Sequence, residues 1–311
     1  MKESPGEKGF SLAGRDGKEI YVRSWEGTQE PEAVVQIFHG MTEHGGRYGR
    51  FAGFLNSRGV AVYADDHRGH GKTAGTVDKL GQVGEDGFNR TVEDEYVLTR
   101  LIKERYPGIP VFLFAHSYGS FLAQDYITRY GREIAGVILS GTSMMNGPGI
   151  GLGTLIALAE KVVYGGYRPS SLIDHMTFSG YNRRIKDAVN KFSWLSRDED
   201  EVRKYIEDPL CGNIFTAEFY HYFFRGLSKL YGRRKTGKIP RSLPVLIAVG
   251  GEDPVGRYGA GARRLYGFYK YLGLQDVEFK LYPGARHEIL NETNRDEVSR
   301  DVLEWMKKRM G

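Results

Sequence analysis

The chain lacks several features that would mark it as secreted or membrane-embedded. It has a single cysteine, Cys211, among 311 residues, so no intrachain disulfide can form, which is typical of reducing compartments. The N-terminal segment MKESPGEKGF contains no apolar stretch like that of a signal peptide, and no apolar run is long enough to cross a bilayer. We therefore expect a cytoplasmic protein, with at most a peripheral and transient contact with a membrane or micelle surface.

A strong excess of charge is also missing. The formal net charge is +5, and the densest basic clusters are Arg233-Arg234-Lys235 and Lys307-Lys308-Arg309. Neither cluster has the interleaved aromatic residues that nucleic-acid-binding segments carry, so we expect no nucleic-acid partner. The basic residues form either a solvated face or a weak attraction to anionic surfaces. Internal repeats are absent, and the sequence does not indicate an oligomeric state.

Apolar strands alternate with polar helices along the first part of the chain. The segment Phe10–Trp25 has the pattern of a β-hairpin around a turn at Asp16-Gly17. Further strands are expected at 33–38, 59–64, 110–115 and 134–139, and helices at 90–106 and 119–130. Short apolar strands between helices predict an α/β fold with a mostly parallel sheet covered on both faces.

This alternation stops in the middle of the chain and then resumes. Between about residues 141 and 242 we find helical patterns only, at 150–164, 198–206 and 216–230. Strand patterns return at 243–254 and 277–289, followed by an amphipathic helix at 294–310. We therefore predict an α/β core formed by residues 1–141 and 243–311, interrupted by a helical cap at 142–242.

A polar break inside an otherwise apolar segment indicates a nucleophile. In FLFAHSYGSFLAQDYI, residues 112–127, a strand pattern ends at His116-Ser117-Tyr118 and a helix pattern follows. The motif A-x-S-x-G around Ser117 matches a nucleophile elbow, in which small residues relieve crowding at a sharp strand-to-helix turn. The alternative is that Ser117 only caps the helix.

A serine nucleophile needs a base and an acid that orients the base. His287 follows the last strand pattern and Asp253 follows the preceding one, which is the chain order that this fold requires. Glu252 competes with Asp253 for the role of the acid. His175 and His221 are rival bases, but they fall in the helical insertion, away from the strand ends.

Two backbone N–H groups should stabilise the oxyanion. We expect one from Tyr118, after the nucleophile, and one from Met41, where Gly40 allows a tight turn after a strand. The side chains of Met41 and Tyr118 would then shape the acyl site. The histidines of the loop Asp66–Gly71 precede the serine and are interpreted as bracing that loop. Since no zinc-ligand spacing is present, we expect no metal and no cofactor.

Three motifs resemble the monoacylglycerol lipases and related lysophospholipases of the α/β-hydrolase superfamily. Residues 39–48, HGMTEHGGRY, resemble the HGxxEHxGRY segment of this group. The loop DHRGHG at 66–71 resembles its D-x-R-G-H-G loop, and residues 196–210 resemble its S-R-x…E-V…D-P-L cap segment. The resemblance extends from about Ala33 to the C-terminus. At the elbow the chain departs from the usual G-H-S-M-G-G, with Ala115, Tyr118 and Ser120 replacing Gly, Met and Gly.

The resemblance implies an α/β-hydrolase that cleaves esters of single-chain lipids, most of all monoacylglycerols, with Ser117, Asp253 and His287 as the catalytic residues. It also implies that Arg47 and Glu201 line a polar pocket for the glycerol head group. Related alternatives are a lysophospholipase, a short-chain carboxylesterase or an aminopeptidase-like amidase, for which the acids at 199–201 would grip a free amine. A non-catalytic ligand-binding protein is the alternative from a different class.

The apolar helix expected at 150–164 offers a cover for an acyl-chain tunnel. Its alternative is ordinary packing against the core. The glycines at its start, between Gly147 and Gly153, predict a mobile entry to this helix, as a lid hinge requires.

Overall fold

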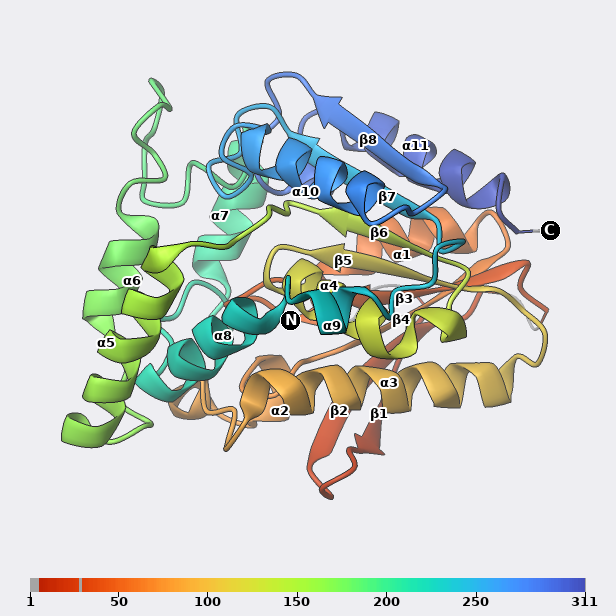
Figure 1. Ribbon diagram of the computed structural model, residues 1–311. Helices are drawn as coiled ribbons and strands as arrows, with labels where there is room; N and C mark the ends of the chain where they lie inside the picture. Colours follow the sequence, from red (N-terminus) through yellow and green to blue (C-terminus); the bar gives the residue numbers. More distant parts are fainter. Residues whose placement is uncertain (1–5, 28–29, 311) are drawn as a thin grey trace.

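The sheet contains eight strands in the order β1-β2-β4-β3-β5-β6-β7-β8. The computed structural model describes residues 6–27 and 30–310 (Figure 1). The strands are β1 (Glu7–Ala13), β2 (Glu19–Trp25), β3 (Ala33–Phe38), β4 (Val60–Asp65), β5 (Val111–His116), β6 (Gly136–Ser140), β7 (Val245–Gly250) and β8 (Val277–Tyr282). The first two strands form the predicted hairpin, and β2 runs antiparallel to β4. From β4 onwards, neighbouring strands in the order β4-β3-β5-β6-β7-β8 pair in parallel.

The central strands are buried along their whole length. Every residue of β3, β4, β5, β6 and β7 is buried, because helices cover both faces of the sheet. The edge strand β8 alternates between buried and exposed positions instead. The apolar runs that predicted these strands are therefore the runs that a doubly covered parallel sheet requires.

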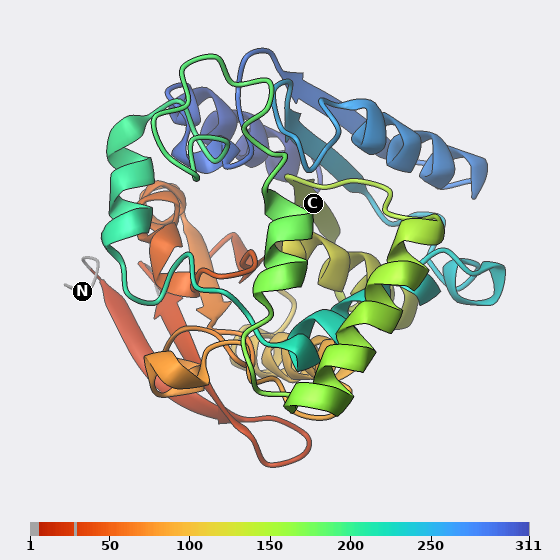
Figure 2. The same cartoon turned by 90° about the vertical axis from the view of Figure 1, so that its left-hand side faces the viewer.

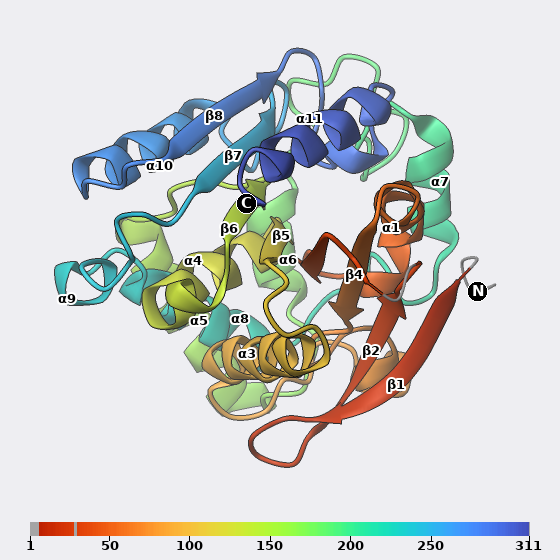
Figure 3. The ribbon, with the colours of Figure 1, turned by 90° about the vertical axis from the view of Figure 1, so that its right-hand side faces the viewer.

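Helices lie on both sides of the sheet. Figure 3 shows α1 and α11 on one side and α3, α4 and α10 on the other. These helices are α1 (Gly49–Asn56), α3 (Gly87–Arg105), α4 (Tyr118–Tyr130), α10 (Ala260–Tyr271) and α11 (Arg295–Lys307). Short helical turns are α2 (Gly71–Ala74) and the 3-10 helices Gly45–Tyr48, Val77–Lys79, Gly131–Glu133 and Ile289–Asn291. The sequence had not predicted α1. Its residues Phe51 and Leu55 belong to a buried hydrophobic cluster that also contains Val35, Val62 and Phe114 of the central strands.

The segment between β6 and β7 forms helices at one end of the sheet, at the left of Figure 1. They are α5 (Pro148–Tyr164), α6 (Ser171–Phe178), α7 (Glu199–Glu207) and α8 (Ala217–Lys229), whereas the short α9 (Arg233–Thr236) lies beside α4, where Lys235 pairs with Asp125. Figure 2, which looks onto this end, shows α5 and α6 facing the viewer. The predicted fold class, an α/β-hydrolase sheet with a helical insertion, is confirmed, while the cap boundaries at 142 and 242 stay predictions.

Helix α5 is the most exposed of the long cap helices. It packs along α8, where Gly153 lies so close to Phe224 that an added Cβ would come within 3.0 Å of the ring. Ala157 is its one buried residue. Of the helices in the described part of the chain, none has the length and apolarity needed to cross a membrane.

Candidate active site

Ser117 occupies a sharp turn between β5 and α4. Its backbone has φ 51° and ψ −117°, a conformation that L-residues rarely adopt. The Ser117 N–H donates to the carbonyl oxygen of Ser140 at 2.9 Å, which holds the turn against β6. The hydroxyl makes no capping hydrogen bond with α4, so the capping alternative has no support in the structure.

Gly119 explains the small residue that follows the serine in the motif. A Cβ at this position would lie 2.2 Å from the carbonyl oxygen of Phe38 and 2.6 Å from that of His39. The start of α4 therefore contacts the backbone of the loop after β3 directly. This contact brings Ser117 next to the loop from which we predicted an oxyanion donor.

The predicted acid and base are hydrogen-bonded to each other. Asp253 follows β7 and His287 follows β8, and His287 Nδ1 lies 2.9 Å from Asp253 Oδ1. The same carboxylate oxygen accepts the N–H of Val255 at 2.8 Å, which fixes its orientation. Since the carboxylate needs a donor, Nδ1 carries the proton and Nε2 is left as the basic nitrogen. Asp253 is fully buried and His287 is 1% exposed, whereas Glu252 is exposed to solvent.

The loop after β3 carries the Met41 N–H, the first of the two predicted oxyanion donors. The N–H of Gly40 donates to Glu43 Oε1 at 2.5 Å, and the carbonyl oxygen of Gly40 lies 2.8 Å from His39 Nδ1. Because the peptide is planar and trans, the Met41 N–H points away from that carbonyl. Within residues 6–27 and 30–310, neither Met41 N–H nor Tyr118 N–H has a hydrogen-bond acceptor, as expected of oxyanion donors.

His39 holds this loop as a neutral imidazole. Burial lowers its pKa well below the usual value, with neighbouring His67 and His70 adding to the effect. Its Nδ1–H donates to the Gly40 carbonyl, and its Nε2 accepts the N–H of His67 at 2.9 Å.

The histidines of the loop after β4 have structural partners, as their interpretation as bracing residues expected. The Nδ1 of His67 lies 2.8 Å from Asp65 Oδ1 and 3.0 Å from Glu95 Oε1. Burial acts against charging this ring, but the two carboxylates outweigh it and raise the pKa of His67 to about 10. Its Nε2 lies 3.2 Å from the carbonyl oxygen of His39, so His67 contacts the predicted oxyanion loop.

Potential metal ligands cluster twice among the described residues, as His39, Asp65 and His67 and as His44, Asp208 and Cys211. In the first group the imidazole nitrogens of His39 and His67 already contact backbone groups or carboxylates. In the second, His44 Nε2 lies 3.1 Å from Asp208 Oδ2. The imidazole nitrogens of both groups thus have partners among the described residues.

Ser117 and His287 line one cavity of about 350 Å³. Met41 and His116 also line it from the core, and Trp194 covers His287 with its ring centroid 4.9 Å away. A cavity of this size can hold a small lipid ester or much of one. It places the predicted nucleophile, base and oxyanion loop around one space.

The cover of this cavity differs from our expectation. The helix α6 contributes Ser171, Asp174, His175 and Phe178 to the lining, whereas α5 contributes none. The other lining residues between β6 and β7 are Ser179, Lys191, Phe192, Trp194, Leu195, Tyr205, Gly212 and Asn213. The structure therefore does not support the cover that we expected from the helix at 150–164, since α5 packs along α8 and Ala157 is its buried residue. His175, the rival base, lies in the lining, but Asp253 is paired with His287.

The side chain of Tyr118 does not shape the cavity. It is buried on the other side of the turn, stacked on His70 at 5.7 Å and in contact with Phe219 and Phe223 of α8 at 5.2 and 5.4 Å. Of the two residues whose side chains we expected to shape the acyl site, Met41 lines the cavity and Tyr118 does not. A tyrosine in place of the usual methionine fits here because α8 supplies an aromatic pocket for it.

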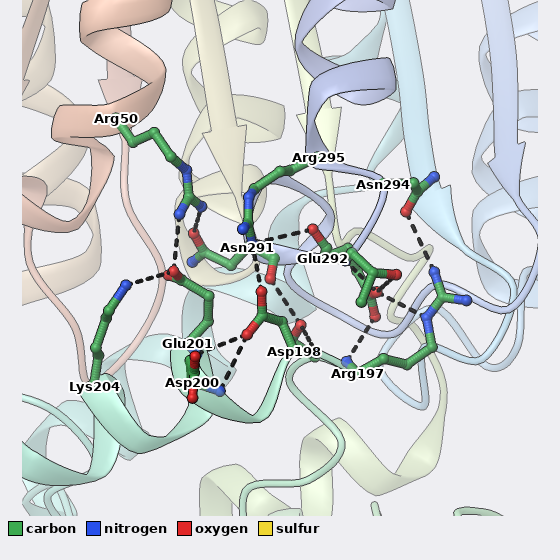
Figure 4. Close-up of polar contacts among 12 residues, drawn as sticks. Arg50, Arg197, Asp198, Asp200, Glu201, Lys204, Asn291, Glu292, Asn294 and Arg295 are labelled. Atoms are coloured by element: carbon green, nitrogen blue, oxygen red, sulfur yellow. Dashed lines mark hydrogen bonds and ion pairs between the residues drawn. The ribbon is translucent and has the colours of Figure 1, made fainter.

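The two residues expected to bind a head group make contacts of their own. Arg47 forms ion pairs with Glu43 and Glu288 and does not line the cavity. Glu201 accepts hydrogen bonds from Arg50 at 2.8 Å and Lys204 at 2.7 Å, and it also lies outside the lining (Figure 4). Their glycerol-binding role stays a prediction that these contacts do not support.

Several residues at the site escaped the sequence analysis. Glu43, which lies inside the motif at residues 39–48, and Glu288, which follows His287, both line the cavity, although we had assigned neither of them a role from the sequence. The cap backbone at Trp194 and Leu195 accepts the N–H groups of His287 and Glu288 at 3.3 and 2.8 Å. The sequence did show that Glu43 and Glu288 stand next to His44 and His287. It did not indicate that they line the site, because acidic residues in loops are usually exposed to solvent.

The parallel sheet, the strained serine after its central strand and the Asp–His pair after later strands define the α/β-hydrolase class. Within this class, the model of the Hydrolase_4 family, described as serine aminopeptidase S33, matches residues 29–294, and the chain belongs to this family.

Known proteins of this kind are similar over nearly the whole chain. A monoacylglycerol lipase of Mycolicibacterium smegmatis is 30% identical, covering 95% of each chain, and the monoglyceride lipase of Homo sapiens is 26% identical, covering 96% of this chain and 90% of its own. Among solved structures, a thermostable carboxyl esterase from Bacillus coagulans in complex with glycerol has a TM-score of 0.90 at 30% identity, covering 98% of this chain and 99% of its own. A monoacylglycerol lipase from Paleococcus ferrophilus has a TM-score of 0.70 at 26% identity, covering 94% and 99%.

Proposed function

We propose that the protein hydrolyses carboxylic esters of single-chain lipids, most of all monoacylglycerols, through an acyl-enzyme formed on Ser117. The observation that carries this proposal is the 2.9 Å hydrogen bond between Asp253 and His287, beside a cavity that Ser117 also lines. The relatives named monoacylglycerol lipase and the esterase neighbour with glycerol support an ester of glycerol as the substrate.

In this mechanism Ser117 Oγ attacks the ester carbonyl while His287 Nε2 takes its proton. The N–H groups of Met41 and Tyr118 bind the oxyanion of the tetrahedral intermediate. The C–O bond to the alcohol then breaks, and His287 returns the proton to the leaving oxygen. Asp253 keeps the imidazole oriented and stabilises its charged form. Water, activated by His287, hydrolyses the acyl-enzyme, releasing the fatty acid and restoring the serine hydroxyl, so no metal or cofactor is required.

The amidase alternative is less well supported than the ester. It relied on acids at 199–201 that would bind a free amine, but Glu201 is paired with Arg50 and Lys204, and Asp200 forms an ion pair with Arg203 at 2.9 Å. None of the three acids lines the cavity. The family description alone therefore does not favour a peptidase over an esterase.

Release of fatty acid from monooleoylglycerol and lysophosphatidylcholine, measured side by side, tests the proposal. Ser117→Ala serves as the blank for both substrates, and an aminoacyl-anilide tests the amidase. We expect turnover of the monoacylglycerol to exceed that of the lysophospholipid at least tenfold. Preference for the lysophospholipid, or turnover of short esters only, would keep the serine mechanism and contradict the substrate.

We also propose that α5 and α6 contact lipid surfaces. Their outward sides expose large apolar residues, with Leu155 at 65%, Val162 at 75%, Val163 at 67% and Met176 at 54%. Other residues of α6 line the cavity, so a surface that holds the substrate would meet the protein beside it. Exposed apolar patches of this extent mark contact sites for membranes or proteins.

Sedimentation with phosphatidylcholine vesicles tests this contact. Leu155→Glu combined with Val163→Glu should reduce the bound fraction several-fold. The control is Tyr271→Glu, which changes an apolar residue that is 77% exposed on α10. Equal binding of all three proteins would contradict the proposal.

A further inference from the structure

Two loops that meet at the cavity are joined by a chain of buried ionic hydrogen bonds. The first half starts in the loop after β3, where Glu43 Oε1 accepts the N–H of Gly40 at 2.5 Å and the hydroxyl of Tyr48 at 2.9 Å. The other oxygen of Glu43 accepts from Arg47 Nη1 at 2.6 Å. Glu43 therefore connects the Arg47 guanidinium to the backbone directly before Met41.

The second half leads to the loop of the predicted base. Arg47 Nη1 and Nη2 donate to the two carboxylate oxygens of Glu288 at 2.6 and 2.7 Å, a bidentate pair. Glu288 directly follows His287. Its second oxygen also accepts from Asn291 Nδ2 at 2.9 Å. The Glu43–Arg47–Glu288 bridge thus spans from the predicted oxyanion loop to the predicted base loop.

The bridge is shielded from solvent. The exposed fractions of the side chains of Arg47, Glu43 and Glu288 are 11%, 3% and 6%. The ring of Tyr205, from α7, covers the guanidinium with its centroid 4.8 Å from Arg47 Cζ. Ion pairs that are largely buried hold a defined geometry, because their mutual attraction is weakened less than in water.

We infer that Arg47 is a positioning residue, which sets the spacing between the loop that carries the Met41 N–H and the loop that carries His287. The inference rests on the proposed function, since it takes Met41 and His287 in their proposed roles. A head-group role would need guanidinium donors that face the cavity. Instead, both terminal nitrogens of Arg47 are bound to carboxylates, and the cavity is lined by Glu43 and Glu288 but not by Arg47.

The two roles predict different kinetics for Arg47→Lys, which keeps the charge and loses the bidentate geometry. A positioning residue acts on every ester with the same acyl group, so kcat should fall by the same factor, about 10- to 100-fold, for monooleoylglycerol and methyl oleate. KM should stay within about twofold for both. A glycerol-binding residue would instead raise KM for monooleoylglycerol and leave methyl oleate unaffected.

Arg50→Lys is the matched control. Arg50 also lies near the base loop, donating to Leu290 O and Asn291 Oδ1 at 2.8 Å, but it bonds Glu201 at its other end and not Glu43 (Figure 4). We expect its kcat to stay within about twofold of the wild type. An equal loss in both lysine variants would overturn the inference, since it would show a general need for arginine near this loop.

A second variant keeps the test decisive if Arg47→Lys fails to fold. Glu288→Gln breaks the same bridge from the other side and should lower kcat for both esters equally, and unchanged kcat would overturn the inference. Selective loss on the glycerol ester would overturn it too. Ser117→Ala separates this inference from the proposed function, because activity that persists in Ser117→Ala contradicts the mechanism whatever the arginine variants do.

Discussion

Replacing Asp253 by asparagine removes a charge while keeping the shape of the site. The amide oxygen can still accept from the Val255 N–H and from His287 Nδ1, at the positions where Asp253 Oδ1 accepts now. The amide nitrogen takes the place of Oδ2, a buried oxygen that has no hydrogen-bond partner among the described residues. We therefore expect Asp253→Asn to fold and to bind substrate, with KM little changed.

We expect the substitution to lower kcat, because the missing negative charge matters once the imidazole of His287 becomes positively charged. In the transition state His287 carries the serine proton, and its attraction to the carboxylate at 2.9 Å is about 6 kcal/mol with an effective dielectric constant of about 20. Since about 1.4 kcal/mol corresponds to a factor of ten, kcat should fall about 10⁴-fold. Removal of the acid from a serine triad has an effect of this order.

The assay is fatty-acid release from monooleoylglycerol, with Ser117→Ala defining the background. Glu252→Gln is the matched control, since it makes the same chemical change one residue earlier, and it should stay within a few-fold of the wild type. If Asp253→Asn retains more than a tenth of kcat, or if Glu252→Gln loses as much as Asp253→Asn, our assignment of the acid is wrong.

Three further outcomes follow from the same contacts. Ser117→Ala should abolish ester turnover and labelling by a fluorophosphonate while the melting temperature stays within a few degrees; residual labelling would point to another nucleophile. Gly119→Ala should lower kcat at least 100-fold and destabilise the fold by about 1–3 kcal/mol, because its Cβ would lie 2.2 Å from Phe38 O; wild-type activity and unfolding curves would refute the close contact. Burial raises the pKa of Glu288, but Arg47 outweighs this effect and lowers the pKa to about 2 from the usual 4.5. The ionised carboxylate therefore stabilises the fold fully above about pH 4.5, and this stabilisation is lost as the pH falls through about 2. Glu288→Gln should therefore be less stable than the wild type at neutral pH, and denaturant titrations should show this difference shrinking by about 3 kcal/mol toward pH 2.

The sequence was sufficient where function depends on local pattern. The apolar run 110–115 followed by Ser117 predicted a strand, a turn and a helix, because strand period and helix period differ within a few residues. Asp253 and His287 could be paired although 34 positions separate them, since the ends of parallel strands meet at one edge of the sheet.

The bridge and the cover of the cavity could not be predicted in this way. Arg47 and Glu288 are 241 positions apart, and only the folded loops bring them together. An isolated arginine in a loop reads equally as a surface residue, a head-group ligand or an ion-pair partner. Similarly, the apolar pattern of α5 is the same whether that helix covers the cavity or packs outside α8, because periodicity does not say which neighbour a face meets.

The hydrogen bonds between the cap backbone and the base loop bear on how this enzyme could be re-engineered. His287 and Glu288 donate their N–H groups to the carbonyl oxygens of Trp194 and Leu195, and the Ser196 hydroxyl donates at 2.8 Å to the carbonyl oxygen of Asn291, which is labelled in Figure 4. A cap taken from another protein would have to reproduce these bonds to hold the predicted base, His287, in its position. Residues 171–178 of α6 line the cavity without such bonds to His287, so we expect that they can be exchanged to alter acyl-chain preference, whereas residues 194–196 have to be kept together with the loop of the predicted base.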